Sequence, residues 1–321
     1  ANTTGTQNVA LGTTTLELNT TGSYNVAIGS STLDKNTTAD SNTGLGYAVL
    51  TNNTTGAENV GVGQAALYNN TTASNNTAVG RSALESNTTG TSNVAIGYQT
   101  MLCNATTGAN TAVGFRAMCC NVGVRNVAMG FASLQLNQGG DDNTALGTCA
   151  LFSNTSASDN TAVGANSLCA NTTGTENVAI GANALDSNTT ASENTAVGIR
   201  ALTANTTGGA NTAVGKNALL DATTSANNTA VGVEALQNVT TGTGSNVGVG
   251  RSSGEGLTTG CFNTMIGFQA GTSSTTPEGN TFIGKAAGCN AVNGNNNTAL
   301  GINAGIDAVK NITGTDTHNI V

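Results

Sequence analysis

The sequence predicts an all-β protein, a β-solenoid of about 18 turns, and three observations carry that prediction. A five-residue pattern that opens with Asn and closes with Gly, as in Asn194-Thr195-Ala196-Val197-Gly198, recurs along the whole chain of 321 residues. The spacing between successive patterns is 17 residues almost throughout, with one of 16 and one of 18. Up to residue 245 the pattern is followed by a Leu or Met column and then, in most repeats, by Asn-Thr-Thr. A period this short is typical of a solenoid, in which one turn buries its apolar side chains only against its neighbours.

The composition fits an ordered, thin-walled repeat. Aromatic residues make up 3% of the chain, Trp is absent, there is one Pro, and charged residues account for 8%. Disordered chains of low hydrophobicity usually carry high charge or much Pro, and they lack regularly spaced β-branched residues. We therefore expect a narrow core of Val, Ile, Leu and Ala.

The charge balance excludes some classes of partner. The net charge is −8 and the pI is about 4.4, and the nine basic residues are scattered, whereas nucleic-acid binding needs clustered Lys and Arg. No apolar run approaches the ~18 residues that span a bilayer, so no membrane insertion is expected. A surface rich in Thr and Asn and poor in charge favours an extracellular or cell-surface location, or a place on a virion.

Within each repeat, the triplet before the Gly is predicted to be a short strand. Its first and third residues, such as Val9 and Leu11, point one way and Ala10 points the other. We expect the Val side of this strand to form the core together with the Leu column. The Gly permits a positive φ or a close approach of two backbones.

The opening Asn residues are predicted to form a structural ladder. Stacked Asn amides can each donate to the next turn and accept from the previous one, and Asn tolerates the left-handed backbone that solenoid corners need. The ladder consists of Asn8, Asn25, Asn42, Asn59, Asn76, Asn93, Asn110, Asn126, Asn143, Asn160, Asn177, Asn194, Asn211, Asn228, Asn246, Asn263, Asn280 and Asn297.

The repeat changes character near residue 246, which divides the chain into two subregions. Residues 1–245 keep the Leu column, whereas in residues 246–321 that place is taken by Gly254, Gly271 and their successors. Losing a Leu in every turn requires closer backbone packing or another group that fills the space.

No catalytic constellation stands apart from the repeat, so we expect no enzyme activity, no cofactor and no metal. The single His is His318, and Asp141-Asp142 is too small a cluster for a typical Ca²⁺ site. The seven Cys residues have no CxxC spacing. Cys103 and Cys120 hold the same place in successive turns, about 4.8 Å apart, which is within disulfide range. For an exported chain we predict that disulfide, with Cys103–Cys119 as the alternative.

The motif Asn93-Val94-Ala95-Ile96-Gly97 resembles the head repeats of YadA-like trimeric autotransporter adhesins, and the longer N-T-A-V-G-x-x-A-L form is similar to repeats of bacteriophage tail fibres. The resemblance covers almost the whole chain but depends on five residues per turn. It implies a left-handed β-roll, a parallel homotrimer, and an adhesive or stalk role.

These observations predict a non-enzymatic extracellular structural or adhesive solenoid that assembles with copies of itself into a filament or stalk. A tail-fibre shaft for binding a host receptor is the alternative, and ice binding through stacked Thr is a third. Both termini look like unfinished turns, which predicts end-to-end stacking of copies. The predicted assembly residues are Asn2, Thr3, Thr4, Asn319, Ile320 and Val321.

Overall fold

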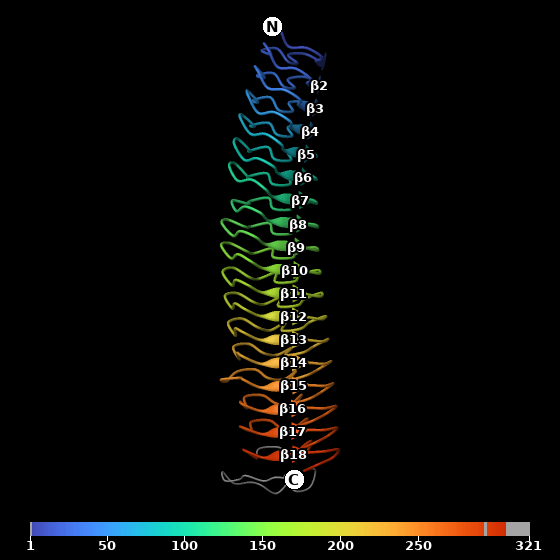
Figure 1. Ribbon diagram of the computed structural model, residues 1–321, viewed down its shortest axis with the longest axis vertical. Coiled ribbons are helices and arrows are strands. Elements are labelled where there is room, and N and C mark those ends of the chain that lie inside the picture. Colours follow the sequence, from blue (N-terminus) through green and yellow to red (C-terminus); the bar gives the residue numbers. More distant parts are fainter. Residues whose placement is uncertain (1, 292–293, 306–321) are drawn as a thin grey trace. The chain divides into compact units, whose positions relative to one another are not determined.

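The computed structural model describes residues 2–291 and 294–305, and it confirms the all-β solenoid with its 17-residue repeat (Figure 1). The chain forms two compact units, residues 1–159 and 160–321. The first unit contains β1 (Val9–Leu11), β2 (Val26–Ile28), β3 (Thr43–Leu45), β4 (Val60–Val62), β5 (Thr77–Val79), β6 (Val94–Ile96), β7 (Thr111–Val113), β8 (Val127–Met129) and β9 (Thr144–Leu146). The second contains β10 (Thr161–Val163), β11 (Val178–Ile180), β12 (Thr195–Val197), β13 (Thr212–Val214), β14 (Thr229–Val231), β15 (Val247–Val249), β16 (Thr264–Ile266), β17 (Thr281–Ile283) and β18 (Thr298–Leu300).

Within each unit, every strand pairs in parallel with the next strand along the chain. The register joins equivalent residues, for example Ala78 with Ala95 in the first unit and Ala196 with Ala213 in the second. The 17-residue spacing therefore sets the pairing directly. Each strand is three residues long, and turns and bends fill the rest of every repeat.

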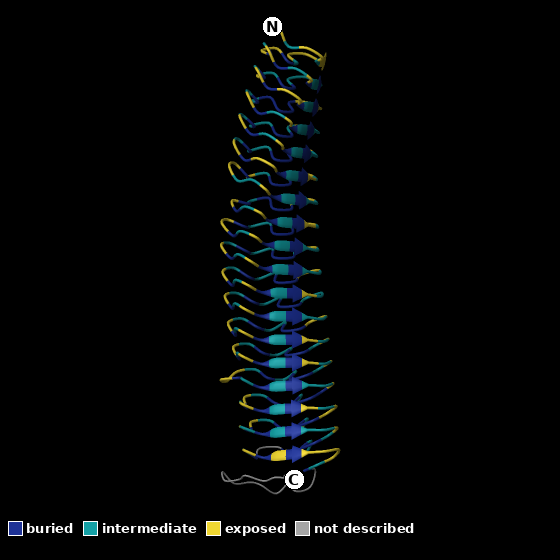
Figure 2. Ribbon diagram, viewed as in Figure 1, coloured by how far each residue is buried: buried dark blue, intermediate teal, exposed yellow. Residues whose placement is uncertain are grey.

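The strand side that faces the interior is the opposite of the predicted one. In β12, Ala196 is completely buried while Thr195 and Val197 are half-buried on the outer side, and most strands share this pattern (Figure 2). The prediction that Val forms the core is therefore wrong, whereas the predicted alternation is correct. The interior consists of the Ala, Leu and Asn columns.

Space inside the turn explains this choice. In two turns of the first unit, the residue before the buried Leu is Thr or Val and the facing strand residue is Gly. A Cβ on Gly44 would lie 2.5 Å from Thr32, and one on Gly61 would lie 2.5 Å from Val49. In a regular turn, the middle strand residue faces a Leu and the small residue directly before that Leu. The narrow interior there accepts no side chain larger than Ala, so the larger Val side chains point outward.

Glycine at the fifth place of the motif serves both predicted purposes. Gly198 has a φ of 139°, and a Cβ there would lie 2.6 Å from the carbonyl of Gly215 in the next turn. The left-handed corners, in contrast, do not fall on the ladder Asn residues as predicted. They fall on residues such as Ser41, directly before an Asn, and on buried Leu residues such as Leu33, whose φ is 51°.

Two of the C-terminal turns fill the space left by the missing Leu from the strand itself. Phe282, in the middle of β17, is completely buried, and a Cβ on Gly288 would lie 2.6 Å from its ring. In the preceding turn, Met265 occupies the space beside Gly271 in the same way. The expected filling group is therefore the strand's middle residue, within the second unit.

Candidate functional site

The opening Asn residues form a hydrogen-bonded ladder in each unit, as predicted. From Asn25 to Asn297 these side chains are at most 1% exposed. The backbone N–H of Asn25 donates to Oδ1 of Asn8 at 2.9 Å, and its Nδ2 donates to the carbonyl of Ala39 at 2.8 Å. The same N–H to Oδ1 contact links successive Asn residues along both units, for example Asn194 with Asn177 at 3.0 Å. Each amide thus ties one turn to the next through the main chain.

A second ladder of buried Asn residues lies beside the first. Nδ2 of Asn36 donates to Oδ1 of Asn19 at 2.9 Å and to the carbonyl of Ala39 at 3.0 Å. The Ala39 carbonyl therefore accepts from both ladders. Similar contacts continue through Asn53, Asn70 and Asn87 in the first unit and through Asn171, Asn188 and Asn205 in the second.

This second ladder ends at Asn205, where the interior becomes apolar. The equivalent positions in the following turns are Ala222, Val239 and Leu257, all completely buried. Oδ1 of Asn205 is consequently a buried acceptor without a hydrogen-bond partner. The change from a polar to an apolar interior thus begins one turn or more before residue 246, where the Leu column is lost.

The unpaired acceptor on Asn205 allows a stabilising substitution to be predicted. Ala222→Asn would place an amide one turn above Asn205, where its Nδ2 can donate to the unpartnered Oδ1. We expect a gain of about 1 kcal/mol in unfolding free energy, the net worth of one buried hydrogen bond. Urea denaturation checks this, with Ala222→Ser as the control that adds polarity without reaching Asn205.

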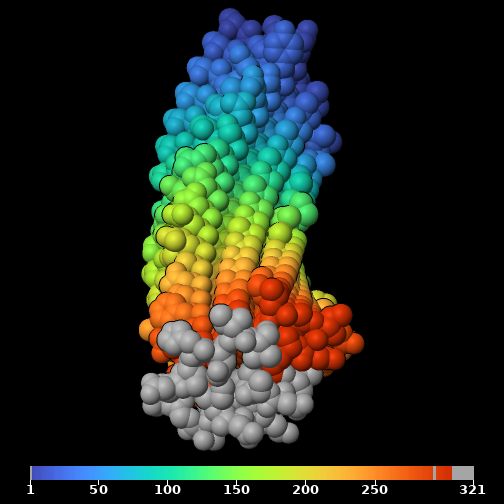
Figure 3. All heavy atoms as spheres, turned by 60° about the horizontal axis from the view of Figure 1, so that its bottom comes forward, coloured from blue at the N-terminus to red at the C-terminus, as the bar shows by residue number. Residues whose placement is uncertain are grey.

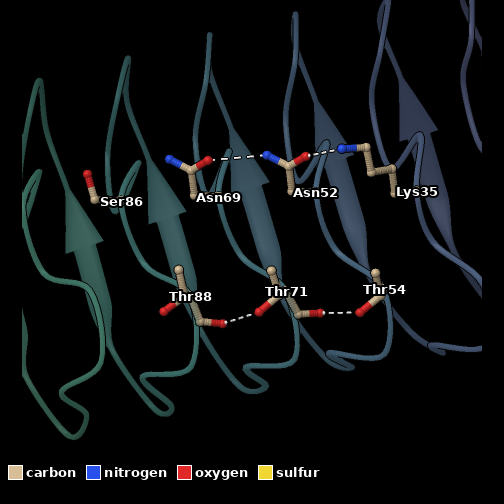
Figure 4. Close-up of a pocket in the computed structure, with 7 residues that line it drawn as sticks. All are labelled: Lys35, Asn52, Thr54, Asn69, Thr71, Ser86 and Thr88. Atoms are coloured by element: carbon tan, nitrogen blue, oxygen red, sulfur yellow. Dashed lines mark hydrogen bonds between the residues drawn. The ribbon is translucent and has the colours of Figure 1, made fainter.

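The Asn-Thr-Thr segments form a polar groove on the surface of the first unit. Oγ1 of Thr54 donates to the carbonyl of Thr71, and Thr71 donates to that of Thr88, each at 3.0 Å (Figure 4). Lys35 and Asn52 line the other side, with Nζ of Lys35 2.7 Å from Oδ1 of Asn52. The groove encloses about 400 Å³.

The Asn-Thr-Thr geometry bears on both glycosylation and ice binding. Asn36, Asn53 and Asn70 each begin an N-x-T glycosylation sequon. All three are completely buried, so their amides are inaccessible in the folded protein. The first Thr of each pair is half-buried and hydrogen-bonded to the next turn, whereas the second, such as Thr55, is exposed. Each turn therefore offers one exposed Thr hydroxyl from this segment, and these hydroxyls form a single column along the stack. Such a column is narrower than the flat Thr face that ice binding requires.

The cysteines predicted to pair lie in adjacent turns. The Cys103 N–H donates to the Cys119 carbonyl at 2.9 Å, and Cys103, Cys119 and Cys120 are all free thiols. Burial raises the pKa of both the Cys119 and the Cys120 thiol, and the neighbouring Cys103 raises that of Cys120 further. The Cys103–Cys120 disulfide stays a prediction for oxidising conditions.

Asp141 and Asp142 are engaged within the protein. The Asp142 carboxylate accepts two hydrogen bonds from the Arg125 guanidinium, from Nε and Nη2, each at 2.7 Å. Oδ1 of Asp141 accepts the Val124 N–H at 2.8 Å. Hydrogen bonding from Arg125 lowers the pKa of Asp142 below its ordinary value.

This ion pair predicts a pH-dependent effect. A lowered folded pKa means that the contact stabilises the fold above the unfolded pKa of about 3.9 and that the effect is lost as pH falls through the folded pKa. We expect Asp142→Asn to lower the thermal midpoint slightly at pH 7 and to leave it unchanged at about pH 2. Glu193→Gln, at the equivalent place in another turn, is the control for the change of charge alone.

The predicted assembly residues at the N-terminus bond to the second turn. The Thr3 and Thr4 N–H groups donate to the Thr20 carbonyl at 2.9 and 3.0 Å, and Oδ1 of Asn2 accepts from Asn19 at 3.0 Å. Asn319, Ile320 and Val321 lie outside the described residues, as does His318.

The outward strand face is the surface feature that the sequence prediction missed. The third residue of every strand is Val, Ile, Leu or Met, and several are well exposed, including Leu45, Ile96 and Met129. Two residues further along the turns, Tyr98, Phe115 and Phe131 form a stack with ring centroids 5.2 and 5.3 Å apart. Arg81 lies over the Tyr98 ring at 5.9 Å. The recurrence of aromatic residues at one repeat position was the signal in the sequence from which this stack could have been predicted.

Figure 3 shows side chains of successive turns aligned in columns, clearest in the yellow-to-orange part of the second unit.

No protein-family model, curated protein or solved structure matches this chain. The resemblance to adhesin head and tail-fibre repeats therefore remains a prediction. Among the residues that the structure describes, no cluster of three or more His, Cys, Asp or Glu side chains could hold a metal ion. Over the same residues, no helix has the length and apolar character needed to cross a bilayer.

Proposed function

We propose that this protein is a structural element of an extracellular filament or stalk, in which copies assemble with one another and their stacked turns form the shaft. One observation carries the proposal. In each unit, buried Asn residues bond every turn to the next through the same contacts, so successive levels are nearly interchangeable. A repeat of this kind suits an elongated support because stability accumulates through neighbour-to-neighbour interfaces.

The surface supports a scaffold role. Polar Asn and Thr side chains cover the groove face, and the regular columns repeat one set of groups along each unit. Repetition of that kind offers many equivalent contacts to a surface or receptor, whose summed strength exceeds that of any one of them. Adhesion through such contacts is part of the proposal.

Electron microscopy of the purified full chain tests this function. We expect filaments longer than a single chain, whose length increases with protein concentration. Discrete particles of single-chain length at every concentration would contradict end-to-end assembly.

A further inference from the structure

The repeat position two residues before each ladder Asn, here called the cap position, links neighbouring turns through a side chain. In the second unit, the Thr175 N–H donates to Oγ of Ser192, the next residue in this column, at 3.0 Å. In the first unit, the Ser23 N–H donates to Oδ1 of Asp40 in the same way, at 2.6 Å. A hydroxyl or carboxylate oxygen of the following turn therefore caps this backbone donor.

Three successive turns of the second unit lack such a cap. The cap position after Ser192 holds Gly209, then Ala226 and then Gly244, and none of these residues has a side-chain oxygen. Among the residues that the structure describes, the backbone N–H groups of Ser192, Gly209 and Ala226 have no hydrogen-bond partner. The missing side chains leave a pocket of about 330 Å³, here called the cap pocket, which is lined by Ser192, Glu193, Gly209, Ala210, Ala226 and Asn227.

We propose that the cap pocket binds a neutral saccharide, whose hydroxyl oxygens take the places of the missing side-chain caps. The inference rests on the adhesive part of the proposed function, for which it names a site and a class of ligand.

The groups around the cap pocket match a ligand that both accepts and donates hydrogen bonds. The free backbone N–H groups need acceptors, whereas the Glu193 carboxylate can only accept and the Asn227 amide can do both. Glu193 and Asn227 are exposed, and within the described part of the chain neither side chain has a hydrogen-bond partner. A hydroxyl has one donor and two acceptor lone pairs, so a ligand with several hydroxyls satisfies both kinds of group.

Two other classes of ligand match the cap pocket less well. An anion would satisfy the N–H groups but would be repelled by Glu193 and by Glu176, one turn before it in the same column of a protein with a net charge of −8. An extended peptide presents carbonyls on one side at every second residue, about 6.7 Å apart, whereas the donors recur about every 4.8 Å. The hydroxyls of a saccharide surround each ring and are not confined to one such spacing.

Solid-state NMR of the full-length chain can observe one of the free donors directly. With glycine labelled by ¹³C at its carbonyl and by ¹⁵N, a nitrogen–carbonyl correlation selects each Gly that follows another Gly, and these are Gly140 and Gly209. The Gly140 N–H donates to Oδ1 of Asn137 at 3.1 Å inside the first unit, so it is an internal control. We expect maltotetraose or cellotetraose to shift the Gly209 signal with a Kd of about 1 mM, since a few hydrogen bonds form in a shallow pocket. The Gly140 signal should not move.

Ala226→Ser tests the cap itself. Its Oγ would accept the Gly209 N–H, as Ser192 accepts that of Thr175, so the Gly209 signal should already move without a ligand. Affinity for the tetrasaccharide should fall at least about tenfold, because one donor is capped and the pocket is partly filled. Ala57→Ser adds the same hydroxyl at a cap position of the first unit and should bind as wild type does.

Three results would overturn the proposal. They are equal affinity of wild type and Ala226→Ser, no shift of Gly209 with either tetrasaccharide up to about 20 mM, and tighter binding of tetragalacturonate or tetra-alanine than of the neutral sugars. Microscopy separates this inference from the proposed function. Filaments that bind no saccharide would refute the saccharide site alone, whereas saccharide binding by particles that never lengthen would refute end-to-end assembly alone.

Discussion

Replacing Phe282 by Ala is expected to destabilise its turn by about 3–5 kcal/mol, and replacing Gly288 by Leu in the same protein should restore most of that loss. Phe282 is completely buried, and its ring fills the place that Leu occupies in regular turns. Gly288→Leu alone should also be destabilising, because its Cβ would lie 2.6 Å from the ring. The double variant recreates the Ala196 and Leu202 pair of a regular turn, so the two effects should couple by about 3 kcal/mol.

Hydrogen exchange of the amides in residues 264–288 measures this locally, which matters because long repeat arrays can lose two-state cooperativity. The reciprocal exchange, Ala196→Phe with Leu202→Gly, is the matched control in a regular turn and should also be tolerated. Destabilisation of the double variant by the sum of the two single effects would contradict a shared space.

Replacing Asn59 by Ala is expected to cost about 2–4 kcal/mol, because it leaves buried polar groups without partners. Asn59 accepts the Asn76 N–H at 3.0 Å and donates from Nδ2 to the Ala73 carbonyl at 2.8 Å. Asn59→Asp should cost more at pH 7, since a carboxylate would then face a carbonyl inside the protein. That extra cost should shrink towards pH 4, where a buried carboxyl with a raised pKa becomes protonated.

Asn52→Asp is the control for this substitution. Asn52 belongs to the half-exposed row of Figure 4 and accepts from the Lys35 ammonium, which would then face a carboxylate. We expect a change within about 0.5 kcal/mol, measured by urea denaturation. Equal losses of unfolding free energy for Asn52→Asp and Asn59→Asp at pH 7 would contradict the prediction, because the cost would then not depend on burial of the ladder amide.

The candidate surfaces were only partly predictable. The recurrence of Asn at one repeat position led directly to the ladder, although its commonest contact runs from backbone N–H to side-chain oxygen instead of from amide to amide. The apolar outer face was missed because Val and Ile were placed inside. Tyr98, Phe115 and Phe131 are also separated by 17 and 16 residues, so only stacking of the turns brings their rings together.

The sequence by itself determined the fold class, the parallel pairing and the register, because a constant period leaves equivalent residues of successive turns as the only consistent partners. It also determined that a column of Asn would be stacked. Only the tertiary structure decided which strand face is buried. Alternation defines two faces of a strand, but the choice between them depends on the volume that the return segment leaves inside each turn. The same volume decided that a turn with a large Phe282 in place of the usual Ala has a Gly288 in place of the usual Leu. It also decided that Leu residues such as Leu33 adopt a left-handed backbone to reach the interior.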